Sequence, residues 1–326
     1  MLTKQIGKKA LVIGAIAQSF PDIDVIASLW LSPADNLLFH RSITHSILFA
    51  IVAALLFSFV SKGLFKQKIS FLFAFLFFCC QLLLHDVLDT CNAYGTGLFE
   101  PFSHQRFSFH LLYVAGSFFT ISIVIAFIAL IVLRKESTLR KQWVVAGLLP
   151  ASFFLVYTIT NKSWIKEQVE KSLLAKHIAY KSIIITPTPF NSFLWYTIAA
   201  TDSGYFIGYR SVFDTKEKLT SFTYFHRHKQ LLENQDSLAD VKQLVQFAND
   251  YYTVEKIGDL LVFNVLRFGQ TLGWQDPKAV FTFQYYLSTS YDNTLVVQRG
   301  RFKGWTKKTF LNLYNRIKGQ QESRLK

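Results

Sequence analysis

The sequence predicts an α-helical membrane bundle of about 4–5 apolar helices, followed by a water-soluble α+β domain. The first observation is a series of long, almost uncharged stretches in the first half of the 326 residues. The second is a change to alternating, β-rich sequence after about residue 177. The third is the composition, with 33 Phe, one Met and a positive mean hydropathy. Helices in lipid need no polar face, so this composition is typical of a chain that lies partly in a membrane.

The same observations predict the domain boundaries. We expect a helical membrane domain over residues 1–160, a linker over 161–176 and a soluble α+β domain over 177–326. The apolar stretches of the membrane domain are residues 10–17, 48–60, 69–84, 111–133 and 143–159.

One of these stretches is the clearest spanning candidate. The 23 residues of 111–133 carry no charge, and about 20 apolar residues suffice for a helix to cross a bilayer. Ser42 or Thr44 is expected to cap the start of the helix over 48–60.

Basic connectors predict the orientation of the chain. Residues 61–68 and 134–141 join apolar stretches and are rich in Lys and Arg, which favours the cytoplasmic side. The segments at the opposite ends of the helices, and everything after Asn161, are then expected outside the cell.

The last part of the chain reads as strands and one helix. Residues 193–200 and 205–213 flank Thr201-Asp202-Ser203-Gly204, a pattern typical of a β-hairpin. Further strands are expected at 260–268 and 279–287, and a helix at 238–251. No catalytic motif stands out in this part.

Charge and cysteine content rank nucleic-acid or anionic-lipid binding last among the functions considered, and they argue against a cysteine-based framework or metal site. The formal charge is +14, but the basic residues are dispersed and form no nucleic-acid module, so the expected partner is a lipid bilayer and not a nucleic acid. Cys79, Cys80 and Cys91 show no C-x-x-C spacing, which argues against a disulfide framework and a thiolate zinc site.

Imidazoles and carboxylates of the first half gather in two polar islands, residues 20–24 with 40–46 and residues 85–89, each at the end of an apolar stretch. Ionisable groups are costly to desolvate at a membrane boundary unless something pairs with them. His85 and Asp89 are four residues apart and share a helix face if the preceding helix continues for one more turn. Alone, such a pair is as often an Asp that merely orients a His.

The other island offers further ligands. Asp22 and Asp24 are expected to point the same way in an extended segment, although a Pro-Asp turn is the plain alternative. His45 is expected in the first helical turn, where the positive helix end keeps its imidazole neutral, and His40 in the loop before it. Considered singly, His40 or His45 is better explained as a polar residue at the membrane boundary than as a metal ligand.

Together these residues predict a metal centre. The expected ligands are Asp22, Asp24, His40, His45, His85 and Asp89. This mixture of nitrogen and oxygen ligands suits zinc, with manganese or iron as alternatives, better than calcium or magnesium. The candidate catalytic residues are Asp24 and two arginines, Arg41 and Arg106, whose guanidinium groups can hold an anion unless they only snorkel to the surface. Asp86, Asn92, Glu100, His104 and His110 are candidates for surrounding contacts.

These motifs resemble a known family. Pro21–Asp24, His40–Ser46, His85–Gly95 and Pro101–Ser103 are similar to the corresponding motifs of the YdjM-type membrane-bound, metal-dependent hydrolases, known in part as LexA-regulated inner-membrane proteins. The resemblance covers about residues 7–160 and implies a multi-pass protein of the bacterial inner membrane. A more distant similarity to zinc-dependent phospholipase C and P1 nuclease, resting on His85 and Asp89, makes phosphoester hydrolysis the first expectation.

The chain departs from the family pattern at two places. Relatives usually carry Thr-His on a helix before the Gly-Lys-Lys stretch, whereas Met1 lies just ahead of Gly7-Lys8-Lys9, and the sequence leaves open whether such a helix, with a further ligand, is encoded upstream. Relatives also tend to have Asp-Pro where this chain has Gly116-Ser117. Two functions therefore stay open: a hydrolase that acts on a phosphoester or lipid-like substrate through a metal-activated water, and an inactive membrane anchor that presents the outer domain.

Overall fold

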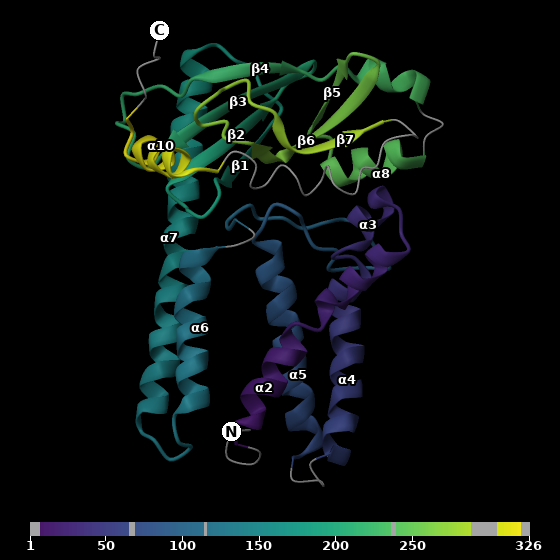
Figure 1. The fold of residues 1–326 in the computed structure, drawn as a ribbon, viewed down its shortest axis with the longest axis vertical. Helices are drawn as coiled ribbons and strands as arrows, with labels where there is room; N and C mark the ends of the chain where they lie inside the picture. The colour runs from purple at the N-terminus through teal and green to yellow at the C-terminus, as the bar shows by residue number, and fades with distance from the viewer. Residues whose placement is uncertain (1–6, 65–68, 114–115, 236–238, 288–304, 321–326) are drawn as a thin grey trace. The chain divides into compact units, whose positions relative to one another are not determined.

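The computed structural model describes residues 7–64, 69–113, 116–235, 239–287 and 305–320 (Figure 1). The chain forms two compact units. The first unit comprises Met1–Ser32, Leu38–Phe109 and Val114–Tyr157, and the second comprises Pro33–Leu37, His110–Tyr113 and Thr158–Lys326.

Helices make up the first half of the described chain. In order they are α2 (Lys9–Gln18), η1 (Pro21–Leu29), α3 (Pro33–Phe39), η2 (Ile43–His45), α4 (Ile47–Leu64), α5 (Phe71–Thr90), α6 (Ser117–Val132) and α7 (Leu139–Ala175). Among the described residues, α4, α5 and α7 are long and apolar enough to cross a membrane. A fourth span is formed if α2 and η1 are counted as one segment bent by 53°. The predicted number of spanning helices is therefore not confirmed.

The predicted and observed apolar helices differ mainly at α6. The sequence predicts a spanning helix over 111–133, but the helix begins only at Ser117, and its 16 residues are fewer than the number that crosses a bilayer. Gly116, at the N-cap, has a ψ of 80°, which is not helical, and no side chain that could cap the helix. Hydropathy alone does not locate such a break.

Small residues pack the helices of the first unit together. Ala50, Ala53 and Ala54 of α4 are buried with Ala74 of α5, and Phe57 stacks edge-on against Phe78. Close backbone approach through small residues is the usual way in which helices associate in lipid.

The pair α6 and α7 uses the same device. The Ser122 hydroxyl donates a hydrogen bond to the Gly147 carbonyl at 3.0 Å. A Cβ atom at Gly147 would lie only 2.5 Å from the Cβ of Ala126, so the close contact requires glycine.

A serine caps α4, but not one of the two residues predicted. Ser46 Oγ accepts a hydrogen bond from Phe49 N at 3.1 Å, whereas Thr44 makes its contacts with Asp24 and His45. The prediction failed because the chain turns through η2 between Thr44 and α4, so the helix begins later than the apolar pattern suggests.

Residues 161–175, expected to be a linker, continue α7 as helix. Ile165, Val169 and Leu173 recur every fourth residue on one helix face and are fully buried. They form one hydrophobic cluster with Ile185, Trp195 and Ala199 of the second unit's first sheet. The apolar spacing of this segment is typical of a helix with one buried face. The predicted domain boundaries stay a prediction.

Two antiparallel sheets form the second unit (Figure 1). The first has the order β1 (Ser182–Pro187), β2 (Leu194–Ala200), β3 (Gly204–Ser211) and β4 (Phe222–His226). The second has the order β5 (Tyr252–Ile257), β6 (Leu260–Gln270) and β7 (Phe281–Tyr286). The accompanying helices are η3 (Lys229–Gln235), α8 (Ala239–Ala248) and α10 (Lys307–Ile317). A soluble domain with two antiparallel sheets therefore follows the apolar helices.

The predicted hairpin is confirmed as β2 and β3. Ala200 pairs with Tyr205 across the turn, and Thr201 N donates to Gly204 O at 2.8 Å. The other predicted strands correspond to β6 and β7, and the predicted helix to α8. These elements were predictable because their apolar periods are local.

A buried carboxylate ties the end of β3 to α10. Asp214 accepts hydrogen bonds from Arg316 Nη1 at 3.1 Å, from Lys218 Nζ at 2.6 Å and from Ser211 N at 2.9 Å. Burial by itself raises the pKa of Asp214, but Arg316 and Lys218 outweigh it and lower the pKa below its ordinary value of 3.8.

We predict that Asp214→Asn destabilises the second unit by about 3 kcal/mol, because it leaves buried cations without their partner. Asp202→Asn, which removes an exposed partner of Lys181, should change stability little. Thermal melts of the full chain, followed by tryptophan fluorescence, measure both variants. Because the folded-state pKa is depressed, the contribution of Asp214 is present above the unfolded-state pKa near 3.8 and is lost as pH falls below it. Equal melting temperatures for the two variants would contradict this.

Candidate metal centre

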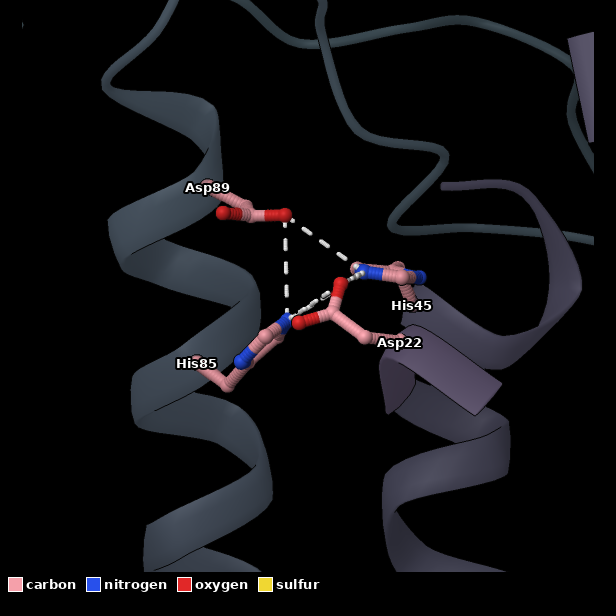
Figure 2. Close-up of side chains that lie close together, drawn as sticks. All are labelled: Asp22, His45, His85 and Asp89. Atoms are coloured by element: carbon pink, nitrogen blue, oxygen red, sulfur yellow. Dashed lines mark hydrogen bonds and ion pairs between the residues drawn. The ribbon is translucent and has the colours of Figure 1, made fainter. Parts of the chain in front are cut away.

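Helix α5 supplies one side of a cluster of imidazoles and carboxylates (Figure 2). The helix continues to Thr90, which meets the condition set in the sequence analysis, so His85 and Asp89 lie one turn apart on the same face. The distance from His85 Nε2 to Asp89 Oδ2 is 3.7 Å.

Two short 3₁₀ segments supply the other side. Asp22 comes from the start of η1, and His45 is the last residue of η2. His45 Nε2 lies 3.5 Å from Asp22 Oδ1, 3.4 Å from Asp89 Oδ2 and 3.2 Å from His85 Nε2 (Figure 2). One ligand atom from each of the four residues lies within 4.8 Å of the others, so the group could hold a metal ion.

The spacing of these atoms fits a small ion. Bonds of 2.0–2.1 Å in a tetrahedral site place neighbouring ligand atoms about 3.4 Å apart. The measured separations of 3.2 Å between the two imidazoles and 3.4–3.7 Å between imidazole and carboxylate bracket this value. Asp89 Oδ2 is buried and lies 2.9 Å from Arg41 Nε, and a carboxylate oxygen in such an ion pair keeps a lone pair with which it can coordinate a metal.

The structure does not bring Asp24 and His40 into this group, although both were predicted as ligands. Asp24 Oδ1 instead pairs with His40 Nδ1 at 2.9 Å. The extended segment predicted around Asp22 and Asp24 is the 3₁₀ helix η1, in which residues two apart point about 120° away from each other. One carboxylate therefore faces the cluster, and the other faces the loop behind it.

Asp24 acts on the cluster through His45. Thr44 Oγ1 donates to Asp24 Oδ2 at 3.0 Å and lies 3.0 Å from His45 Nδ1. Since the hydroxyl proton is used for the carboxylate, the hydroxyl oxygen is free to accept from Nδ1–H. This tautomer leaves the Nε2 lone pair facing the cluster, the arrangement that metal-binding histidines commonly share.

The carboxylates near His45 shift its pKa in the direction opposite to that expected from a helix end. The sequence suggests a neutral imidazole near a helix end, and burial by itself lowers its pKa. The carboxylates of Asp22 and Asp89 outweigh burial and raise the pKa of His45 to about 9. Without a metal ion the cluster thus attracts a proton, and the excess of negative charge that causes this also favours a cation.

Arg41 lies against the cluster. Its Nε is 2.9 Å from Asp89 Oδ2, and its guanidinium carbon lies 5.2 Å from the centre of the Tyr94 ring. The side chain is buried, and Nη1 has no hydrogen-bond partner among the described residues. The backbone φ of 61° is unusual for a non-glycine residue and is held by neighbouring contacts.

The loop after α5 provides those contacts. Gly97 N donates to Arg41 O at 2.9 Å, and a Cβ at Gly97 would lie 3.4 Å from the same oxygen. Arg106, predicted as catalytic, donates to the carbonyl of His40. Burial and the nearby Arg41 lower the pKa of Arg106 to about 10. Arg106 therefore ties the loop to the polar island.

The five surrounding candidates are scattered. Asn92 accepts from Tyr94 N, and His104 pairs with Glu100 at 2.8 Å with an exposed ring. Asp86 is buried in α5 and has no hydrogen bond with the described residues, and His110 belongs to the second unit. The sequence analysis missed Thr44 and Tyr94 as site residues. Both lie inside the quoted motifs, which was the available signal.

Comparison with known proteins identifies the family. The family model described as YdjM inner membrane protein matches residues 1–165. The chain belongs to the YdjM inner membrane protein family. The resemblance stated from the motifs is thereby confirmed.

A curated relative of this YdjM family member is also an inner membrane protein. "Inner membrane protein YbcI" of Escherichia coli (strain K12) is 34% identical over 107 residues, which cover 32% of this chain and 61% of the relative. No solved structure matches the chain significantly.

We predict that this YdjM family member binds about one metal ion per chain and that His85→Ala loses it, because three remaining ligands hold the ion far less tightly. His104→Ala is the matched control, since its exposed ring pairs with Glu100 outside the cluster. Elemental analysis of protein purified from cells supplied with zinc, manganese and iron measures the content. A metal-free wild type, or full retention in His85→Ala, would contradict the prediction.

Proposed function

We propose that the protein is a membrane-bound metal-dependent hydrolase that acts on a phosphoester or lipid-like substrate. The observation that carries the proposal is the cluster of Asp22, His45, His85 and Asp89. Its side chains range from His45, which is fully buried, to Asp22, which is 47% exposed. A buried wall with one exposed ligand suits a site that a substrate enters from solvent.

Zinc is the proposed ion, with manganese or iron as alternatives, because two imidazoles and two carboxylates form a mixed ligand set. When bound, such an ion lowers the pKa of water and polarises a phosphoryl oxygen. We propose that Asp24, with Thr44 and His40, positions the buried ligand His45. This assignment replaces the direct ligand roles first expected for Asp24 and His40.

Arg41 is the proposed binder of the substrate's anionic group. Its Nη1 has no hydrogen-bond partner in the described part of the chain, and its Nε stands beside the ligand Asp89. A guanidinium fork suits phosphate or carboxylate. Helix α5 carries His85 and Asp89 near the end of an apolar segment, so a substrate with an apolar tail and an anionic head is the proposed lipid-like substrate.

We predict turnover of a generic phosphodiester or of a phospholipid by the metal-loaded protein. Asp89→Asn should lower kcat at least about a hundredfold, because it removes a ligand and the partner of Arg41. Arg41→Gln should mainly raise KM for anionic substrates. Rates for His104→Ala should match the wild type. Turnover that survives in Asp89→Asn would come from a contaminant and would overturn the proposal.

An inactive membrane anchor is the second candidate. Gly116 favours it, because this residue stands where family members tend to carry an aspartate and offers no side chain. A metal-loaded protein that turns over none of the tested phosphoesters and phospholipids would select the anchor.

The proposed orientation puts the cluster and the second unit outside the cell. The basic connectors that join the apolar stretches support it, and it requires the apolar stretch 111–133, of which the 16-residue helix α6 is a part, to cross the membrane. With Cys79, Cys80 and Cys91 replaced by Ala, we predict that Asp202→Cys reacts with a membrane-impermeant maleimide in intact cells. Lys62→Cys should react only after permeabilisation. The reverse pattern would invert the topology.

A further inference from the structure

A polar cavity lies within the second unit, at the end of β3. Its volume is about 100 Å³. The lining comes from β3, from the segment leading to β4, from the turn after β6 and from the end of α10. No role in the proposed hydrolysis has been assigned to it.

Three side chains that line this cavity have polar groups without a hydrogen-bond partner among the described residues. They are Arg210 through Nε, Thr220 through Oγ1 and Trp274 through Nε1. Arg210 and Thr220 are 1% and 2% exposed, so water outside the protein does not serve them. A buried donor without a partner is costly, and each such group calls for an occupant.

Arg210 is otherwise firmly held. Its Nη2 donates to Thr215 O at 2.8 Å, and its Nη1 donates to Lys218 O. Its Nε is 4.0 Å from the nearest oxygen of Asp214, too far for a hydrogen bond. The guanidinium is therefore fixed in place, and its Nε has no hydrogen-bond partner among the described residues.

The lining has an excess of positive charge. Its cations are Arg210, Lys218 and Arg316, and its one carboxylate is Asp214. That carboxylate is already hydrogen-bonded to Lys218 and Arg316. Water can satisfy an N–H group but cannot offset two positive charges in a largely buried site.

The geometry points to a binding site for a single phosphate group. The cavity has room for about three water molecules, which suits one tetrahedral oxyanion and excludes a nucleotide. A phosphate dianion would balance the excess charge and accept from Arg210 Nε and Trp274 Nε1. Leu219, also in the lining, is 46% exposed, so the cavity lies near the surface of the second unit. This site is independent of the proposed hydrolase activity.

Titration calorimetry with inorganic phosphate tests the site. The full chain is kept in detergent with EDTA and at constant ionic strength, so that a metal ion in the cluster contributes no phosphate binding. We predict saturable one-site binding that Lys218→Met weakens about tenfold. Lys216→Met is the matched control, because this exposed lysine of the same segment does not line the cavity, and it should leave the affinity unchanged.

A second variant guards against a folding defect in Lys218→Met. Trp274→Phe keeps the aromatic ring and removes only the N–H donor, so it should weaken binding several-fold with an unchanged melting temperature. His85→Ala should bind phosphate like the wild type. Absence of saturable binding in the wild type, or equal weakening by Lys216→Met, would overturn the site.

Competition identifies the source of the phosphate group. Glycerol 3-phosphate and short-chain phosphatidic acid are each titrated against bound phosphate. Equal competition indicates a soluble phosphomonoester, and stronger competition by phosphatidic acid indicates a lipid headgroup.

Discussion

The first unit depends on the burial of an imidazole between carboxylates at the end of apolar helices. His45 is fully buried and lies within 3.5 Å of Asp22, Asp24 and Asp89. Such a group of charges is unstable away from water unless a proton, a guanidinium or a metal ion compensates it. Arg41 supplies part of this compensation through Asp89. The loop that holds Arg41 in its unusual backbone conformation is thus part of the same constraint.

The cluster is built from an α-helix and from two 3₁₀ helices. Helix α5 presents His85 and Asp89 in a spacing that any straight helix gives. The segments η1 and η2 are short 3₁₀ helices, whose tighter turn sends Asp22 and Asp24 to different sides. As a result Asp22 faces the metal position, while Asp24 and Thr44 fix the ring of His45. The segment η1 therefore supplies both a candidate ligand, Asp22, and Asp24, a residue that positions another candidate ligand.

In the second unit, a buried carboxylate is surrounded by cations. Its sheets bury one apolar core, and Ile165, Val169 and Leu173 of α7 form a second apolar cluster on the other face of the first sheet. Asp214 gathers Lys218 and Arg316 at the edge of that core. Cations outnumber carboxylates around the adjoining cavity, so the same network that stabilises the fold also prepares a place for an anion.

The sequence by itself determined the features that repeat over short distances. Apolar runs predicted the apolar helices α4 and α5, alternation predicted the hairpin of β2 and β3, and a spacing of four predicted the face shared by His85 and Asp89. The tertiary structure decided the rest: which of Asp22 and Asp24 faces the cluster, the late start of α6 and the contacts of Arg41. Those outcomes depend on segments far apart in the chain. A periodic pattern reports only the local backbone, whereas the partners of a buried charge are fixed by what packs against it.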